Sequence, residues 1–280
     1  LDRDSFIQLL PRVAGVVKEV LVTQGDEVGK GEVLAVLESP VMGEVKAAFL
    51  DAGRKTETSK ADLDRFIRIR ENTLELISFL GSDPVLAEFQ QDDFGDMWDY
   101  GSRLISAYAD YSVTKKAYER KEGLYEKRIS SQKDYLETQG AYERSRAEYL
   151  AQLANVRFSL EQEMLSRSET YRANLFSMKA AERQLGILGL TEEEISNLAE
   201  RLDLQEGEPS GDQAGRDLTR VLVKAPRAGT ILERNLGTGE KVEAETAIFT
   251  LADLDQVWAC LKVPSRDLAS VETGQMVTVE

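Results

Sequence analysis

The chain has 280 residues, of which 42% are hydrophobic and 30% are charged, values typical of a folded, helix-rich protein with one large or two to three small domains. Its formal net charge of −15 argues against binding to nucleic acid, which needs a basic surface, and against adhesion to anionic membranes. One cysteine excludes an internal disulfide and a thiolate metal cluster, and the lack of histidine removes the commonest general base and metal ligand.

The first residues predict short β-strands. Residues 1–11 hold an apolar run ending at Pro11, an entering strand that could belong to a barrel. Residues 12–38 alternate valine and leucine with polar residues and are punctuated by glycines, which is typical of strands and tight turns.

This segment returns 214 positions downstream without a gap. Ala14-Gly15 corresponds to Ala228-Gly229, and Gly25 corresponds to Gly239. Neither copy has enough apolar surface to fold alone. We therefore expect residues 12–38 and 220–252 to form one split β domain.

The middle of the chain contains two ladders of apolar residues at seven-residue spacing, mirrored about position 130. Their members are Leu104, Tyr111, Tyr118 and Tyr125, then Tyr135, Tyr142, Tyr149 and Val156. A seven-residue repeat keeps one helical face against a partner helix, and the mirror symmetry indicates that the partner is the same chain folded back. The alternative is that these tyrosines form the core of a compact bundle.

Residues 39–190 are therefore predicted to form a long antiparallel helical hairpin with its tip near 128–131. Ser39 and Pro40 suit the start of the first helix, and Gly81-Ser82-Asp83-Pro84 interrupts it. The first arm has surplus residues around 81–95, which form either a bulging loop or an extra packed helix. The second arm is expected from about Gln132 to Leu188.

The remaining segments are shorter. Residues 191–219 are expected to hold a short helix, opened by a capping box of Thr191 and Glu194, and a mobile polar loop. Residues 253–280 are expected to begin a separate, truncated β domain. Because the chain begins without methionine and ends within an expected strand, we expect it to be a piece of a longer protein.

The sequence offers little chemistry for catalysis. Its many carboxylates fall mostly on helices, where they form a solvated face, and the acidic patch at Asp92, Asp93, Asp96 and Asp99 lacks the spacing of a calcium loop. No run of about 18 apolar residues predicts a membrane-spanning helix. We therefore predict no enzyme activity, no catalytic residue, no cofactor and no metal site.

The repeated β segments, with their Ala-Gly and Gly-Asp/Glu turns, resemble the two halves of a split biotinyl/lipoyl-like domain. Residues 124–130 (LYEKRIS) look like the hairpin tip of periplasmic adaptor, or membrane fusion, proteins, and 188–195 (LGLTEEEI) are similar to the segment after the hairpin in the heavy-metal branch of that family. The segment from Asp253 to Gly274 looks like the start of the family's β-barrel. The implied fold is α+β, a helical hairpin inserted between two halves of a lipoyl-like sandwich and followed by a barrel.

The resemblance implies a periplasmic adaptor of a tripartite efflux pump of the resistance-nodulation-division (RND) class, exporting heavy metals or drugs. Its partners would be an inner-membrane RND transporter, an outer-membrane channel and further copies in a ring, expected to be a hexamer. The full-length protein would be anchored to the inner membrane. The family's tip carries an arginine, a leucine and a serine that dock the channel, and Arg120, Leu124 and Ser130 match these in order.

Three alternatives stay open at this point. The chain could serve an ABC-type or type I exporter, or it could be a structural coiled-coil spacer. It could also be a biotinyl or lipoyl carrier subunit, which would need a modifiable lysine where the two β halves join. The junction here is Glu38-Ser39-Pro40 and a long insertion, which disfavours the carrier.

Overall fold

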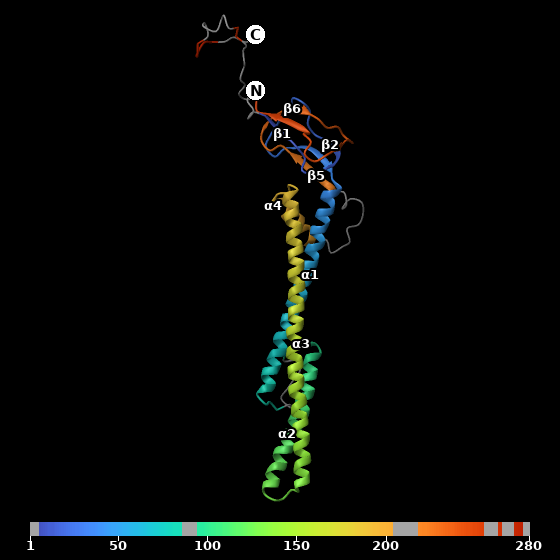
Figure 1. Cartoon of the computed structure of the whole chain (residues 1–280), viewed down its shortest axis with the longest axis vertical. Helices are drawn as coiled ribbons and strands as arrows, with labels where there is room; N and C mark the ends of the chain where they lie inside the picture. The colour runs from blue at the N-terminus through green and yellow to red at the C-terminus, as the bar shows by residue number, and fades with distance from the viewer. Residues whose placement is uncertain (1–5, 86–93, 204–217, 255–262, 265–271, 277–280) are drawn as a thin grey trace. The chain divides into compact units, whose positions relative to one another are not determined.

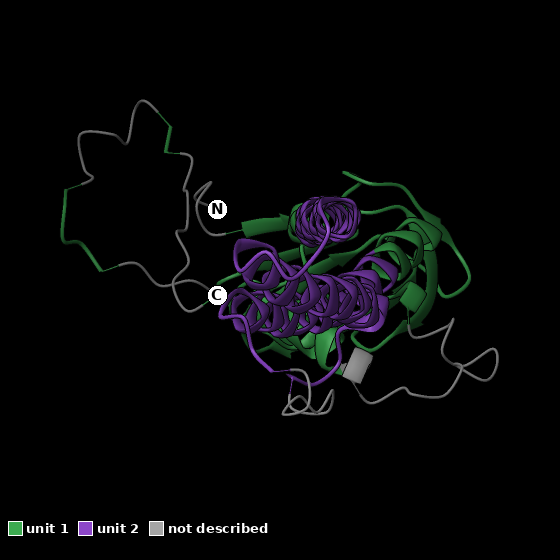
Figure 2. Ribbon diagram, turned by 90° about the horizontal axis from the view of Figure 1, so that it is seen from below, with its two compact units in different colours: residues 1–48, 183–280 green, residues 49–182 purple. Residues whose placement is uncertain are grey.

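The computed structural model describes residues 6–85, 94–203, 218–254, 263–264 and 272–276. The chain divides into two compact units, residues 1–48 with 183–280 as unit 1 and residues 49–182 as unit 2, coloured separately in Figure 2. The α+β prediction of a helical hairpin inserted into a split β-sandwich is confirmed. The residues expected to begin a barrel lie mostly outside the described ranges, as does the polar loop expected at about 205–217.

Unit 1 contains two four-stranded antiparallel sheets. One sheet has the order β1-β8-β6-β3 and the other β5-β4-β2-β7. The strands are β1 (Phe6–Leu9), β2 (Gly15–Val20), β3 (Glu27–Val28), β4 (Val33–Glu38), β5 (Arg220–Lys224), β6 (Gly229–Arg234), β7 (Lys241–Val242) and β8 (Phe249–Ala252).

The 214-residue repeat is built as an exchange of strands between the two halves. β2 pairs with β4 of its own half and with β7 of the other half, and β6 correspondingly pairs with β8 and with β3. The repeat also includes the entering strand, because β1 pairs with β8 as β5 pairs with β4. Each sheet thus needs strands from both halves, so neither half can complete a sheet alone.

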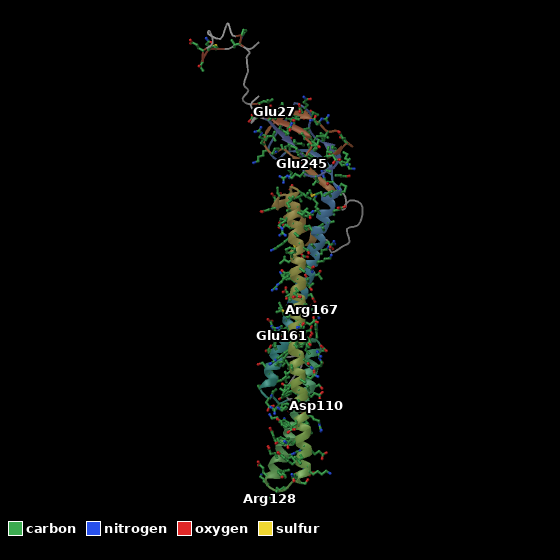
Figure 3. All side chains as sticks on the ribbon, in the orientation of Figure 1. Glu27, Asp110, Arg128, Glu161, Arg167 and Glu245 are labelled. Atoms are coloured by element: carbon green, nitrogen blue, oxygen red, sulfur yellow. The ribbon has the colours of Figure 1, made fainter. Side chains whose placement is uncertain are left out.

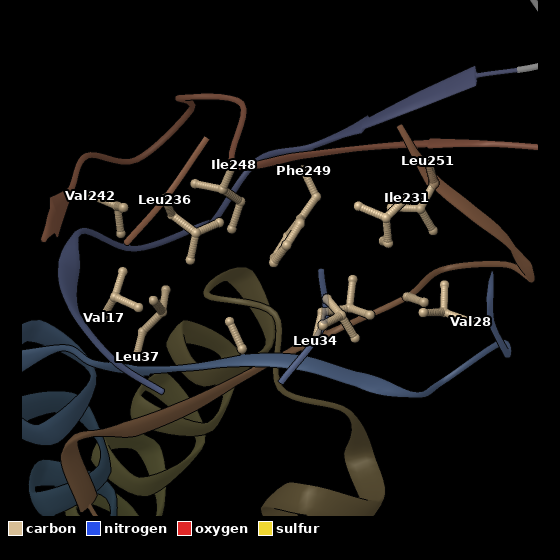
Figure 4. Close-up of a cluster of buried hydrophobic side chains, with 13 residues drawn as sticks. Val17, Val28, Leu34, Leu37, Ile231, Leu236, Val242, Ile248, Phe249 and Leu251 are labelled. Carbon is tan, nitrogen blue, oxygen red and sulfur yellow. The ribbon is translucent and has the colours of Figure 1, made fainter. Parts of the chain in front are cut away.

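The core of unit 1 lies between the two sheets (Figure 4), where Val17, Leu34, Ile231 and Phe249 are among the fully buried side chains. Equivalent glycines allow two paired strands to approach closely in each sheet, β2 with β4 and β6 with β8. A Cβ on Gly15 would lie 2.6 Å from the carbonyl oxygen of Glu38, and a Cβ on Gly229 would lie 2.7 Å from that of Ala252. These close approaches explain why the repeat has Ala-Gly at both places.

The helices of unit 1 begin as the sequence predicts. Helix α1 (Pro40–Gly81) starts directly after β4, and the N–H of Met42 donates to Ser39 Oγ (3.4 Å). Helix α4 (Glu192–Asp203) opens with the expected capping box, in which the N–H groups of Thr191 and Glu194 donate to each other's side chains (3.0 and 3.2 Å). Glu194 also pairs with Lys224 Nζ of β5 (2.7 Å), which fixes α4 to the sandwich.

Unit 2 consists of the rest of α1 with α2 (Trp98–Glu126) and most of α3 (Gln132–Ile187) (Figure 1). The predicted mirror pairing is confirmed by the rings along α2 and α3. Tyr125 and Tyr135 have centroids 4.8 Å apart, Tyr118 and Tyr142 are at 5.1 Å, and Tyr111 and Tyr149 at 5.4 Å. The hairpin is therefore paired through residues equidistant from position 130.

The first arm uses its surplus residues by overlapping two helices. The side-chain amide of Asn72 donates to the carbonyl of Asp96 (2.9 Å), and the Tyr108 hydroxyl donates to the carbonyl of Pro84 (2.9 Å). The end of α1 and the start of α2 therefore run side by side in the same direction, both antiparallel to α3. The surplus is thus taken up by the overlap of α1 with α2, and the described residues between Gly81 and Trp98 form no additional α-helix.

This overlap creates a three-helix core in unit 2. Buried residues come from α1 (Phe66, Ile69, Leu76), from α2 (Tyr100, Leu104, Tyr108) and from α3 (Tyr149, Val156, Leu160). Asp83 closes the end of α1 with a positive φ of 60° and contacts the ammonium of Lys115. Lys115 holds the pKa of Asp83 below its usual value, against the opposing effect of burial.

Candidate functional site

The hairpin tip joins α2 to α3 in a tight turn whose outermost labelled residue in Figure 3 is Arg128. The N–H of Arg128 donates to the carbonyl of Tyr125, and the N–H of Ile129 donates to the carbonyl of Leu124, both at 2.9 Å. These two bonds are those of a Schellman motif, with Arg128 at φ 59° in the left-handed position that glycine usually occupies. The turn is thus hydrogen-bonded without a glycine.

The start of α3 is capped by Ser131. Its Oγ accepts the N–H of Asp134 (3.2 Å), as an N-cap serine does. The carboxylate of Asp134 pairs with Lys121 Nζ of α2 (3.3 Å), so the ion pair crosses the hairpin. Lys121 and then the Ser131 hydroxyl hold the pKa of Asp134 below its usual value.

Stacked tyrosines support the tip from inside. Tyr118 contacts both Tyr135 and Tyr142, at centroid distances of 5.9 and 5.1 Å. The Tyr118 hydroxyl donates to Glu122 Oε1 (2.7 Å) and lies 3.2 Å from the Tyr135 hydroxyl. These hydrogen bonds, first the one with Tyr135 and then the one with Glu122, raise the pKa of Tyr118 above its usual value. The tip is therefore held by backbone hydrogen bonds in the turn and by ring contacts between α2 and α3 behind it.

The three residues expected to dock a channel lie at this tip in different settings. Arg120 is exposed, and the residues that the structure describes give its guanidinium no ion pair. Leu124 lies one turn further along the same face of α2 and is also exposed. The hydroxyl oxygen of Ser130, in contrast, is buried and has no hydrogen-bond partner among the described residues. Arg120 and Leu124 are thus available to a partner, and Ser130 points its hydroxyl inward.

A family model described as CzcB-like, barrel-sandwich hybrid domain matches residues 5–253, which include the sandwich, the hairpin and the tip. The chain belongs to this family. The resemblance to periplasmic adaptors of the heavy-metal branch, expected from the sequence, is thereby confirmed.

Individual relatives of this CzcB-like chain are distant. It is 20% identical to the cobalt-zinc-cadmium resistance protein CzcB of Cupriavidus metallidurans over 278 residues, 99% of this chain and 33% of that protein. A UPF0194 membrane protein of Acidithiobacillus ferridurans is 34% identical to this chain over 111 residues, which are 40% of this chain and 32% of that protein. The chain therefore spans about a third of the length of the curated relatives it matches. The solved structure of ZneB from Cupriavidus metallidurans is 16% identical, with a TM-score of 0.30 and coverage of 98% of this chain and 71% of that one.

Ile129 is the tip residue of this CzcB-like hairpin that the sequence analysis missed. Its side chain is 71% exposed beside Leu124, with Tyr125 exposed on the same turn. An isoleucine in a polar turn is a sequence signal for a contact surface, because exposing a large apolar side chain to water is unfavourable. Together Leu124, Tyr125 and Ile129 give the tip an apolar surface beside the charge of Arg120.

No group of three potential metal-ligating side chains occurs within the ranges that the structure describes. A groove of about 340 Å³ between α2 and α3 is open and polar, lined among others by Arg103, Asp110 and Glu148. No helix in the described ranges is long and apolar enough to cross a membrane.

Proposed function

We propose that this chain is the sandwich and hairpin part of a non-catalytic periplasmic adaptor that links an inner-membrane RND transporter to an outer-membrane channel. The observation that carries the proposal is the tip, where a hydrogen-bonded, glycine-free turn presents exposed Arg120, Leu124 and Ile129. An end with an apolar centre and a cation, Arg120, that has no ion pair with the described residues is suited to docking between helices of a partner. The family membership supports the assignment to efflux.

Heavy metals are the proposed class of exported substrate. The support is the name of the relative CzcB, a cobalt-zinc-cadmium resistance protein, which aligns with 99% of this chain. In this proposal the adaptor works in the periplasm and is anchored to the inner membrane in the full-length protein. Several copies form a ring around the transport path.

The test replaces the exposed tip residues in the full-length protein, expressed with its transporter and channel. The double variant R120E/L124S should fold normally and lose metal resistance to the level of a strain that lacks the adaptor. The matched control is V113S/K116E, which changes an exposed apolar and an exposed basic residue about two turns back along α2. The control should retain resistance. Undiminished export by a stably expressed R120E/L124S protein would overturn the proposal.

A further inference from the structure

The tip of the hairpin has the opposite charge to the rest of the chain. Residues 111–136 contain seven basic and four acidic side chains (7 − 4 = +3), so the rest of the chain carries a formal charge of −18 (−15 − 3). Two of the seven cations are neutralised within the fold, because Lys115 pairs with Asp83 and Lys121 pairs with Asp134. The positive charge therefore remains on the other basic side chains of this segment.

Four exposed cations lie close to the turn and form no ion pair with the residues that the structure describes. They are called here the basic collar, and they are Arg120, Lys127, Arg128 and Lys133. Because Lys121 pairs with Asp134 across the hairpin, the residues that precede these two, Arg120 and Lys133, lie at the same level of α2 and α3. Arg128 is in the turn itself, at the end of the hairpin (Figure 3). The basic collar thus includes residues of both helices and of the turn.

Helix stability explains only part of the basic collar. Lys127 and Arg128 follow the C-terminal end of α2, where the partial negative charge of a helix favours cations. Lys133, in contrast, lies in the first turn of α3, where the partial positive charge of a helix disfavours a cation. The adjacent carboxylate of Asp134 is already paired with Lys121. Nothing in the described part of the fold gains from the charge of Lys133, which points to a partner outside the chain.

Apolar side chains lie among these cations. Ile129 follows Arg128 and is 71% exposed, whereas Leu124 and Tyr125 are only 37% and 38% exposed. One protruding apolar side chain is too little for stable binding to a lipid surface, which needs a larger apolar face. A small apolar centre with charged residues at its rim is instead the usual composition of a contact between proteins.

We propose that the surface which the tip meets on its protein partner is acidic, with carboxylates that face the basic collar and an apolar socket for Ile129. This inference rests on the proposed function, in which that partner is the outer-membrane channel. An acidic surface is attracted by the tip and repelled by the charge of −18 on the rest of the chain, so the charges favour contact through the tip. Charges at the rim of an interface act mainly on the rate of association, and salt weakens their effect.

The test measures how fast the full-length protein associates with the purified outer-membrane channel of the same pump, by surface plasmon resonance in detergent at about 0.1 M and about 1 M NaCl. The variant K127E/R128E/K133E should associate at least about 10-fold more slowly than wild type at the lower salt concentration, and the difference should shrink at the higher one. The conservative variant K127R/R128K/K133R keeps the charges and should associate as fast as wild type. Circular dichroism of both variants should show unchanged helix content, because all three positions are exposed.

The matched control is R157E/R172E/K179E, which changes the net charge by the same amount at exposed positions of α3. Residue 157 is 24 residues beyond residue 133, which is about 36 Å along the helix and several times the Debye length of about 10 Å at 0.1 M salt. The control should therefore associate within about twofold of the wild-type rate.

Three results would overturn the inference. The first is an equal rate for wild type and K127E/R128E/K133E, or a difference that salt leaves unchanged. The second is equal slowing by the control, which would assign the effect to net charge rather than to the tip. The third is cosedimentation with phosphatidylglycerol vesicles that K127E/R128E/K133E loses while it associates normally with the channel, which would assign the basic collar to a lipid surface. Wild-type protein that does not bind the channel at all would remove the proposed function as well, whereas the three results above leave it intact.

Discussion

Arg167 of α3 should be the side chain on which the junction of α1, α2 and α3 depends most. Its guanidinium lies 5.0 Å from the ring centroid of Phe66 in α1 and 5.3 Å from that of Trp98 in α2. It also pairs with Asp62 of α1 and, at 3.2 Å, with Glu163 of its own helix. This one arginine, labelled in Figure 3, therefore contacts residues of all three helices.

The expected cost of R167M follows from these contacts. Two cation–π contacts contribute about 0.5–1 kcal/mol each, and the two ion pairs, whose carboxylates are about half exposed, contribute about 0.5 kcal/mol each. Arg167 Nε is buried without a hydrogen-bond partner among the described residues, and its removal offsets part of the loss. We therefore expect unfolding of unit 2 to require about 2 kcal/mol less free energy in R167M.

The assay is urea unfolding followed by the fluorescence of Trp98, in a background where W258F removes the other tryptophan. The control is R172M, because Arg172 is exposed on the same helix and should cost less than about 0.5 kcal/mol. Equal destabilisation by the two variants would refute the reasoning, because it would show that the cation–π and ion-pair contacts of Arg167 add nothing.

Three further predictions follow from the packing. A double-mutant cycle of Tyr111 and Tyr149 to leucine should give a coupling of about 1 kcal/mol in urea unfolding, because the rings are stacked at 5.4 Å, and additive losses would contradict the pairing. Gly15→Ala should destabilise unit 1 by about 1–3 kcal/mol, because its Cβ would clash with a carbonyl oxygen. Gly123→Ala, whose Cβ meets no atom within 4 Å, should instead stabilise unit 2 by up to about 1 kcal/mol. Thermal melts measure both effects, and a similar change in the two variants would contradict the role assigned to Gly15. Because the pKa of Asp83 is lowered in the folded state, its carboxylate stabilises the fold above its unfolded pKa of about 3.8, and this stabilisation is lost as pH falls through the lower folded pKa. The difference in unfolding free energy between wild type and D83N should therefore narrow below about pH 4. A difference that does not depend on pH would contradict this prediction.

The pairing of α2 with α3 could be predicted because periodicity and symmetry coincide in the sequence. Tyrosines at seven-residue intervals mark the seam, and the equal distance of Tyr118 and Tyr142 from position 130 fixes the register. The split sandwich could likewise be predicted, because a gapless repeat places each glycine turn at an equivalent position. The exchange of strands between halves could not, because hydrogen-bond partners leave no trace in the spacing of the repeat.

The overlap of α1 with α2 was left open by the sequence. Pro84 shows that the first helix must end, but a proline does not say in which direction the chain continues. Contacts of Asn72 with Asp96 and of Tyr108 with Pro84 decide the direction, and all of these are tertiary. The turn itself also gave a weak local signal, because Arg128 adopts a left-handed conformation for which glycine or asparagine is the usual marker.

The candidate site could be predicted only in part. Arg120 and Leu124 were located by the family resemblance, and the structure leaves both exposed. The expected role of Ser130 stays a prediction, and its buried hydroxyl makes it the least accessible of the three. Ile129 was missed because side-chain exposure in a turn depends on the hydrogen bonds that set the path of the backbone.

The central claim, that the hairpin tip is the docking end of an efflux adaptor, is tested most directly by photocrosslinking in cells. A photoreactive amino acid is placed at Leu124 in the full-length protein and, for comparison, at Val113, which is exposed on the same helix away from the turn. We predict a covalent adduct between position 124 and an outer-membrane channel protein, and none from position 113. Equal adducts from both positions, or an adduct from position 124 only to inner-membrane proteins, would contradict the account.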